Sequence, residues 1–469
     1  MERSDSVTLG TLAHLRHFEL VQFSEKQPPF QGQTKAWSSG PGFFTIAAKP
    51  RFKKSWNDFF MKEFFKVTDL EKVLAYASDF PRVDIEEVPL DKAAGRILAE
   101  DIVSDFDLPD FERSTMDGYA VKAASTFGST EGNPAYLAIK GVVEMGESPA
   151  FSIAPGEAAK ISTGGMLPDG ADSVVVIEHT EAVDDVTIEA YKSVAPGQNV
   201  LAKGEDVQKG DIMLTCGRKL RSQETGLLAA FGRETIRVFR RPVIAIISTG
   251  DEVVPINEIP GPGQIRDINS YTLATLVQGA GGVPIMLGIV GDNIDELFER
   301  CTTALAQSDM VLISGGSSVG TRDFTIEVLA ALSDAKILVH GISISPGKPT
   351  ILARSGNQAI WGLPGHVVSA MVVFEIVIRP FIERIAGLSA EHKNVFKLSA
   401  LLSRNLSSAQ GRIDYVRVRL VEKEGVLWAE PILGKSGLIH TMVKADGLIE
   451  IGINSEGLDK GTEVEVILI

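Results

Sequence analysis

The sequence predicts a multidomain protein of mixed α/β and β class, built around a three-layer α/β/α domain with a parallel-type sheet. Three observations predict this class. The chain has 469 residues, which at about 150 residues per domain corresponds to roughly three domains. Between residues 240 and 388, short apolar runs alternate with helical patterns, as in a parallel sheet covered on both faces. The flanking regions instead contain short β segments separated by Gly and Pro.

Shifts in pattern along the chain predict its division into domains. Residues 1–62 form an N-terminal extension, 63–103 and 205–239 a small helical linker domain, 104–204 an inserted β-rich lobe, 240–388 the α/β/α domain, and 389–469 a C-terminal β-barrel domain. A helix is expected near 68–80, with Thr68 or Asp69 as its cap. We expect this helix to pair with a second one at 220–232.

The N-terminal extension differs from the rest in composition. It contains nine Lys or Arg residues against five Asp or Glu, and it has no sustained period. We expect a disordered tail or an upstream start codon, with Met61 as the true first residue. A partner-binding arm is the alternative.

Charge and composition exclude several classes of protein. The formal net charge of −15 argues against nucleic-acid binding, which draws its affinity from clustered Lys and Arg. The two cysteines, Cys216 and Cys301, are far apart in sequence, which excludes a disulfide framework and a structural zinc site and favours a cytoplasmic location. No apolar run approaches the roughly 18 residues of a membrane-spanning helix.

The 240–388 segment predicts alternating strands and helices. Strands are expected at 242–249, 283–290, 309–316 and 359–365, and helices near 269–280, 293–307, 323–332 and 366–387. Sheets of this kind bind ligands at the carboxyl ends of their strands.

Acidic residues follow several of these predicted strands. Asp251 and Glu252 follow the first, Asp292 the second and Asp323 the third. Carboxylates gathered at one edge repel one another and any anionic ligand, and a hard cation such as Mg²⁺ removes that conflict. The alternative for each Asp is a helix N-cap, and Asp292 and Asp323 are placed to serve both purposes.

A Gly-Ser loop follows the third strand in the stretch SGGSSVG. Its small residues leave backbone N–H groups open to an oxyanion, and the next helix adds its positive N-terminal dipole. Phosphate or pyrophosphate is therefore the expected ligand. A tight turn is the alternative for one or two of the glycines. The candidate binding residues are Gly315, Gly316, Ser317, Ser318 and Gly320.

The stretch GISISPGKPT resembles a nucleotide-binding P-loop but fails its spacing. Five residues separate Gly341 from Gly347, and Pro349 occupies the Ser/Thr position that would bind magnesium. We expect Pro346 and Pro349 to present Lys348 in a rigid, extended loop.

Three weaker signals lie in or beside the β-rich lobe. Asp117 precedes a Gly, Thr163 precedes another Gly, and Asp206 lies at the junction with the linker. For the first two, a simple turn is the alternative explanation.

Seven ordered motifs together resemble one family. The motifs are DLPDFERSTMDGYAV, ISTGGMLPDGADSVV, GEDVQKGD, ISTGDEVV, SGGSSVGTRDFT, SPGKPT and GLPGHVVSA. They resemble molybdopterin molybdenumtransferase, the MoeA proteins, to which the E domain of gephyrin is similar. The resemblance begins at about residue 65 and continues to the C-terminus. It implies a molybdopterin-binding fold for the α/β/α domain.

The resemblance implies the last step of molybdenum cofactor synthesis. Adenylylated molybdopterin and molybdate would be the substrates, and molybdenum-loaded cofactor and AMP the products. It also implies Mg²⁺ and a homodimer whose site lies between the lobe of one subunit and the α/β domain of the other. The molybdopterin adenylyltransferase and recipient molybdoenzymes are further candidate partners.

The resemblance also assigns residues. The catalytic set is Asp117, Thr163, Asp206, Glu252, Asp292 and Asp323. Of these, Glu252, Asp292 and Asp323 would hold the metal. Lys348, Pro346 and Arg412 join the Gly-Ser loop in binding substrate, with Arg412 reaching across the dimer.

Two positions depart from the family pattern. Ser345 stands where many members have Lys, and His366 and Val367 replace the Asn-Pro of a GLPGNPVSA motif. The alternative functions are a molybdopterin-binding, adenylyltransferase-like protein and a gephyrin-like scaffold.

Overall fold

The computed structural model describes residues 67–315, 322–393 and 396–469. The predicted extension at residues 1–62 lies outside the described residues. So do four candidate residues of the Gly-Ser loop, namely Gly316, Ser317, Ser318 and Gly320.

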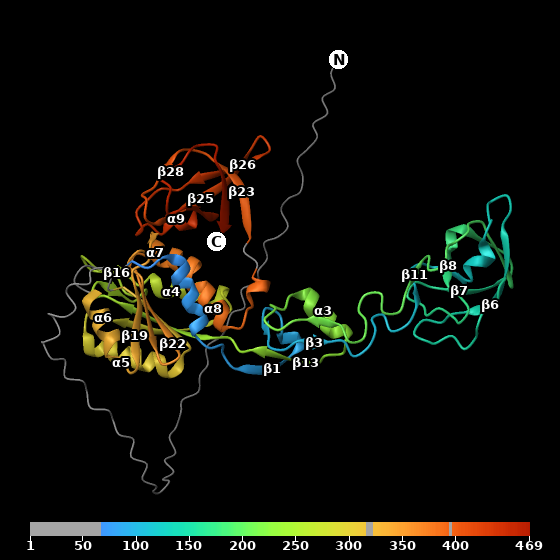
Figure 1. Ribbon diagram of the computed structural model, residues 1–469, viewed down its shortest axis with the longest axis horizontal. Coiled ribbons are helices and arrows are strands. Elements are labelled where there is room, and N and C mark those ends of the chain that lie inside the picture. Colours follow the sequence, from blue (N-terminus) through green and yellow to red (C-terminus); the bar gives the residue numbers. More distant parts are fainter. Residues whose placement is uncertain (1–66, 316–321, 394–395) are drawn as a thin grey trace, which may run out of the picture. The chain divides into compact units, whose positions relative to one another are not determined.

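The α/β/α domain is built on a six-stranded sheet. Its strands lie in the order β17 (Val283–Val290), β14 (Val243–Thr249), β18 (Met310–Ser314), β22 (Gln358–Leu363), β21 (Ile351–Ser355) and β19 (Ala335–His340). The first four are parallel and the last two antiparallel. The covering helices, which lie on both faces (Figure 1), are α4 (Asn269–Gly279), α5 (Ile294–Gln307), α6 (Arg322–Ala331), α7 (Val367–Val373), the π-helix η5 (Phe374–Ile378) and α8 (Arg379–Ile385).

Every strand and helix predicted in this segment is present within a few residues of its expected bounds. The prediction missed β19 and β21, which form an antiparallel hairpin at the sheet edge. Both strands are short and have no helix between them, so they lack the strand-loop-helix alternation on which the prediction relied.

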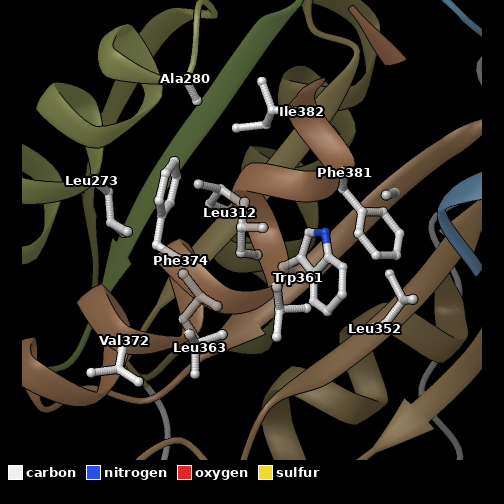
Figure 2. Close-up of a cluster of buried hydrophobic side chains, with 14 of the residues drawn as sticks. Leu273, Ala280, Leu312, Leu352, Trp361, Leu363, Val372, Phe374, Phe381 and Ile382 are labelled. Atoms are coloured by element: carbon white, nitrogen blue, oxygen red, sulfur yellow. The ribbon is translucent and has the colours of Figure 1, made fainter. Parts of the chain in front are cut away.

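Alternate residues of the interior strand β14 enter two separate cores. Ile244 and Ile246 pack in a cluster with residues of α4, α7 and α8, whereas Ala245 and Ile247 pack with residues of α5 and α6. All four are fully buried, and burying a side chain the size of Ile contributes about 1.5–3 kcal/mol. In the first cluster, Trp361 meets Phe381 edge-on, with ring centroids 4.9 Å apart (Figure 2). The sheet is therefore a rigid support for the loops at its ends.

The helix expected near residue 70 is α2 (Leu70–Ala75), which continues as a 3-10 turn, η1 (Tyr76–Asp79). Its expected pairing with the helix at 220–232 is wrong. Leu70, Val73 and Phe80 instead join the Trp361 cluster of the α/β/α domain. Asp69 is the N-cap residue, but its side chain accepts no capping hydrogen bond.

The linker region contains small antiparallel sheets and one helix. Its elements are β1 (Ile85–Pro89), β13 (Thr235–Phe239) and β2 (Ile97–Leu98) in one sheet, the pair β3 (Ile102–Val103) and β12 (Ile212–Leu214), and α3 (Ser222–Ala230). The helix packs its buried Leu228 against this region's own core rather than against α2.

The inserted lobe is a six-stranded sheet of mixed direction. Its order is β8 (Ser173–Val176), β5 (Gly118–Val121), β7 (Glu157–Ile161), β6 (Ala135–Val142), β10 (Thr187–Ala190) and β9 (Thr180–Asp184). A two-stranded pair, β4 (Arg113–Ser114) and β11 (Val200–Leu201), lies where the chain enters and leaves the lobe.

The C-terminal domain is a closed barrel. The ring consists of β25 (Ile413–Lys423), β26 (Val426–Pro431), β23 (Lys397–Leu402), β29 (Glu463–Leu468) and β27 (Gly447–Ile451), and the β25–β27 pairing closes it. The short pair β24 (Leu406–Ser407) and β28 (Gly457–Leu458) and the helix α9 (His440–Val443) complete it. A further strand, β20 (Ile344–Ser345), comes from the α/β segment and pairs with β25.

Across the described ranges, no helix is both long enough and apolar enough to cross a membrane.

Candidate functional site

Three strands of the parallel sheet end together at its carboxyl edge. The last residue of β14, Thr249, is in register with Val290 of β17, and its neighbour Ser248 is in register with Ser314 of β18. The strands therefore end at the same level.

The predicted acidic side chains gather at this edge. The Asp251 carboxylate accepts a hydrogen bond from the backbone N–H of Asp292 at 2.9 Å, which joins the loops after β14 and β17. Burial of its carboxyl, followed by repulsion from Asp251 and Glu252, raises the pKa of Asp292 above its ordinary value, although the residue as a whole is exposed. We call Asp251, Glu252 and Asp292 the acidic cluster. Its members repel one another in the absence of a cation.

The cap explanation for Asp292 is wrong. The N-cap of α5 is the next residue, Asn293, whose side chain accepts a hydrogen bond from the N–H of Glu296 at 3.1 Å. Because the cap is already supplied, the Asp292 carboxylate is not required for helix formation. Asp323 is the second residue of α6, so it does not precede that helix as expected, and its side chain lies outside the described set.

Gly315 begins the Gly-Ser loop in a conformation that favours glycine. Its φ is +121°, and a Cβ at this position would overlap the carbonyl oxygen of Thr249. Gly315 therefore lies in close contact with the end of β14, which only a residue without a Cβ allows.

A buried polar layer beneath these loops was missed by the sequence analysis. Asp267 accepts hydrogen bonds from the Ser248 hydroxyl at 3.1 Å and the Ser270 N–H at 3.0 Å. The Asn269 amide donates to the Ser314 hydroxyl at 2.6 Å and the Gly365 carbonyl at 2.8 Å. These bonds fix the ends of β14 and β18. The only sequence signal was the stretch RDINS, polar except for its isoleucine, directly before and within a predicted helix.

The Lys348 loop is attached to the barrel. Ser345 of β20 is in register with Asp414 of β25, and the Ile413 N–H bonds to the Ser343 carbonyl at 2.8 Å. Arg412 directly precedes this pairing. Its Nε lies 2.8 Å from Oδ1 of Asp414, and its reach across a dimer stays a prediction.

The expected extended form of the Lys348 loop is wrong in part. Pro346 and Gly347 form a turn, and the Thr350 hydroxyl donates to the Gly347 carbonyl at 2.7 Å. Glycine is required in this turn because a Cβ would overlap the side chain of Val373. The turn, rather than a straight proline-rich segment, sets the position of Lys348.

His366 bridges the α/β/α domain to the barrel. It is the N-cap residue of α7, and its Nδ1 lies 2.8 Å from the hydroxyl of Ser436. The Val368 N–H also bonds to the Ser436 carbonyl at 3.0 Å. The histidine that departs from the family pattern thus has a structural contact within this chain.

In the lobe, the structure brings Asp117 and Thr163 together. Oδ1 of Asp117 accepts hydrogen bonds from the backbone N–H of Thr163 at 2.7 Å and from its hydroxyl at 3.0 Å. These two bonds, the backbone bond most strongly, lower the pKa of Asp117. The simple-turn alternative for Asp117 is wrong, because Gly118 begins β5 and a Cβ there would overlap the Val175 carbonyl. Thr163 does lie in a turn.

Thr163→Val is expected to raise the pKa of Asp117 toward its ordinary value without fully restoring it. The substitution removes the hydroxyl bond but keeps the backbone N–H, which is the larger cause of the lowering. Carboxyl-carbon NMR titration of the full chain measures the shift. Thr163→Ser, which keeps the hydroxyl, is the control and should leave the titration unchanged.

Asp206 lies at the base of the lobe, apart from that pair. Its N–H bonds to the Leu108 carbonyl at 3.0 Å, and its side chain is exposed. Nothing in the described residues brings it into contact with Asp117 or with the acidic cluster.

The donor set of the acidic cluster fits Mg²⁺. Magnesium usually binds one or two protein carboxylates and completes its shell with water and substrate phosphate. Glu252 and Asp292 supply two such carboxylates, and their repulsion is what a divalent cation relieves. Within the described ranges, no group of three or more His, Cys, Asp or Glu side chains is arranged to hold a metal by itself. Any third ligand must therefore come from elsewhere.

Comparison with protein families accounts for most of the chain. The MoeA N-terminal region (domain I and II) matches residues 68–232, a probable molybdopterin binding domain matches residues 245–384, and the MoeA C-terminal region (domain IV) matches residues 399–469. The chain belongs to the MoeA family.

Relatives and solved structures agree with this assignment. The molybdopterin molybdenumtransferase of Haemophilus influenzae is 36% identical over 81% of this MoeA-family chain and 93% of its own length. The Bacillus subtilis molybdopterin molybdenumtransferase is 32% identical over 82% of this chain and 90% of its own length. A crystal structure of a Pyrococcus horikoshii molybdopterin biosynthesis MoeA protein is 40% identical, covers 86% of this chain and 99% of its own, and superposes with a TM-score of 0.71.

The candidate residues are distributed over the three matched MoeA regions. The N-terminal region contains Asp117, Thr163 and Asp206, the molybdopterin binding domain contains the acidic cluster and Lys348, and the C-terminal region contains Arg412. The predicted site residues of this MoeA-family chain are therefore spread over all three regions.

Proposed function

We propose that this chain inserts molybdenum into adenylylated molybdopterin, consuming molybdate and releasing AMP, in the last step of molybdenum cofactor synthesis. The observation that carries the proposal is the acidic cluster at the carboxyl edge of the probable molybdopterin binding domain. A ligand with a pyrophosphate linkage requires neutralisation at this edge, and the cluster together with a divalent cation supplies it.

The residues of the chain have distinct tasks in this proposal. Glu252 and Asp292 would hold Mg²⁺, with Asp323 as a further ligand, and the cation would neutralise charge on the phosphates when bound. The loop that begins at Gly315 would bind the phosphate groups through its backbone N–H groups. Lys348 and Arg412 would attract molybdate, which is a tetrahedral dianion.

The assembly belongs to the proposal as well. A homodimer would complete the site, with Asp117, Thr163 and Asp206 supplied by the lobe of the partner subunit. The pairing of Asp117 with Thr163 supports this role, because it holds one carboxylate oxygen in place and keeps the group ionised. The absence of a disulfide between Cys216 and Cys301 supports a cytoplasmic location. The molybdopterin adenylyltransferase and recipient molybdoenzymes remain candidate partners.

The test is molybdate-dependent release of AMP from adenylylated molybdopterin in the presence of Mg²⁺. Glu252→Gln and Asp323→Ala are expected to lower the rate by on the order of 100-fold or more, because metal binding supplies several kcal/mol. Glu258→Gln is the matched control, since it removes an exposed carboxylate from the same segment. Correctly folded Glu252→Gln and Asp323→Ala variants with full turnover would contradict the site. AMP release that is independent of molybdate would contradict the reaction.

A further inference from the structure

The buried amide of Asn269 connects the ends of two neighbouring parallel strands. Its nitrogen donates hydrogen bonds to the Ser314 hydroxyl at 2.6 Å and to the Gly365 carbonyl at 2.8 Å. Ser314 is the last residue of β18, and Gly365 follows β22, which pairs with β18 in the sheet. Asn269 is 8% exposed and Ser314 is 1% exposed, so water does not compete for the bond between them. The amide is therefore a fixed connection between two segments of the carboxyl edge.

The side chain of Asn269 does not serve its own helix. Asn269 is the first residue of α4, and Asn near a helix start commonly caps the helix. Here the N-cap is Ile268, which supplies no capping side chain. The Asn269 carbonyl oxygen is buried and has no hydrogen-bond partner among the described residues. A buried acceptor without a donor is a cost, so the two donated bonds are what hold the amide in this orientation.

Asparagine is the residue type that this geometry requires. The Gly365 carbonyl can only accept, so the group opposite it must donate, and the same group must also reach the Ser314 hydroxyl. An amide nitrogen supplies two donors from one atom, whereas a carboxylate supplies none and a hydroxyl supplies one. Replacement of Asn269 by a smaller or apolar residue therefore releases at least one of the two segments.

The segment that contains Ser314 leads directly into the candidate site. Ser314 precedes Gly315, the first residue of the loop proposed to bind phosphate. Beyond the strands, the direct backbone bond between the two segments joins the Gly315 N–H to the Leu363 carbonyl and is long, at 3.4 Å. The shorter bonds of Asn269 are consequently the stronger restraint on the position of Gly315.

We propose that Asn269 is a positioning residue for the insertion reaction, which holds Ser314 and thereby sets the place of Gly315 against the phosphate groups of the substrate. The residue acts from beneath the site, through Ser314, and is not itself a substrate contact. This inference rests on the proposed function and goes beyond it, because it assigns a task to a buried side chain outside the candidate set.

The test separates the Michaelis constant for adenylylated molybdopterin from the turnover number. Asn269→Ala adds no charge and removes both bonds, so it is expected to raise KM for this substrate by about tenfold or more. The turnover number should change less than KM, because a phosphate contact made equally in the bound substrate and in the transition state contributes uniform binding. KM for molybdate should be unchanged, since Lys348 and Arg412 lie on other segments.

Ser314→Ala and Ser308→Ala form a matched pair at the two ends of one strand. Ser314→Ala removes one of the two Asn269 bonds and should raise KM for adenylylated molybdopterin by about threefold. Ser308 is also buried, lies two residues before β18, and donates its hydroxyl to the Ala304 carbonyl at 2.8 Å. Ser308→Ala should lower the denaturant midpoint by a similar amount and leave KM unchanged. This pair decides the question even where Asn269→Ala does not fold.

The double variant tests whether the two residues act as one unit. Asn269→Ala with Ser314→Ala should show the KM of Asn269→Ala alone, because the bond is already lost. Multiplied effects would show that Ser314 acts without Asn269 and would overturn the inference. So would KM values for Asn269→Ala and Ser314→Ala equal to that of Ser308→Ala, while wild-type turnover leaves the proposed function intact. A wild type without molybdate-dependent turnover would overturn the proposed function and this inference with it.

Discussion

Asp292→Asn is expected to lower molybdenum insertion on the order of 100-fold or more, and at the same time to raise the melting temperature of the metal-free protein. The loss follows from removing one of the two described carboxylates proposed to hold Mg²⁺. The gain follows from the repulsion within the acidic cluster, which the neutral amide removes while keeping a side chain of the same size. A substitution that stabilises a protein and inactivates it is typical of a functional site.

The pH dependence of this stabilisation has a defined sign. The native state of Asp292 binds its proton more tightly than the unfolded state, because the native pKa lies above the ordinary value of 3.8. Stability from this group is therefore fully present at pH values below 3.8 and is lost as the pH rises through the native pKa. The advantage of Asp292→Asn should be absent in acid and reach a plateau near neutral pH, at roughly 1–3 °C given the exposure of the residue.

Thermal melts of the wild type and Asp292→Asn across this pH range measure the effect, with and without Mg²⁺. Mg²⁺ should raise the melting temperature of the wild type and not that of the variant. Asp295→Asn removes the same charge from the first turn of α5 and is expected to lower stability slightly, because acids near a helix N-terminus are favourable. A lower melting temperature for metal-free Asp292→Asn at neutral pH would show that the cluster is not under repulsion.

Gly315→Ala is expected to cost several kcal/mol of unfolding free energy and to abolish insertion activity. The new Cβ would overlap the carbonyl oxygen of Thr249, which belongs to the neighbouring strand and cannot move without shifting the sheet. The φ of +121° adds backbone strain for any residue with a side chain. Since the loop proposed to bind phosphate starts at this residue, displacement at Gly315 is transmitted directly to it.

Comparing the denaturant unfolding of Gly315→Ala with that of Gly281→Ala separates the steric overlap from the backbone strain. Gly281 has a φ of +88°, and a Cβ there would meet no atom within 4 Å. Gly281→Ala should therefore cost only the left-handed backbone penalty, about 1–2 kcal/mol. Equal stability of the two variants would mean that the contact with Thr249 relaxes at little cost.

The sequence predicted the four parallel strands and the helices of the α/β/α domain, and the edge at which the acidic residues gather. Buried parallel strands are runs of apolar residues with recognisable limits, and topology requires that their carboxyl ends coincide. Asp251, Glu252 and Asp292 could therefore be placed together from the sequence alone. The contact between Asp117 and Thr163, 46 residues apart in sequence, was not predicted, because the family motifs name both residues but not their pairing.

What the sequence could not predict depends on packing between distant segments. The pattern around Leu70 correctly indicated a helix, but an apolar face does not specify the surface that it meets, and it meets the Trp361 cluster instead of α3. Asn293 and Asp292 are both good N-cap residues, and only the local backbone decides between them. The glycine after Asp117 indicated a turn, although its actual requirement is the close approach of the Val175 carbonyl.

The β20–β25 pairing means that the segment carrying Lys348 leaves its own sheet, forms two residues of strand with the barrel, and then returns through β21. The chain consequently cannot be cut into an independent pterin-binding module and a dispensable tail. A destabilised barrel would therefore displace Lys348, because the segment before this residue is hydrogen-bonded to β25. Loss of oxyanion affinity could then arise from a change that touches no charged group.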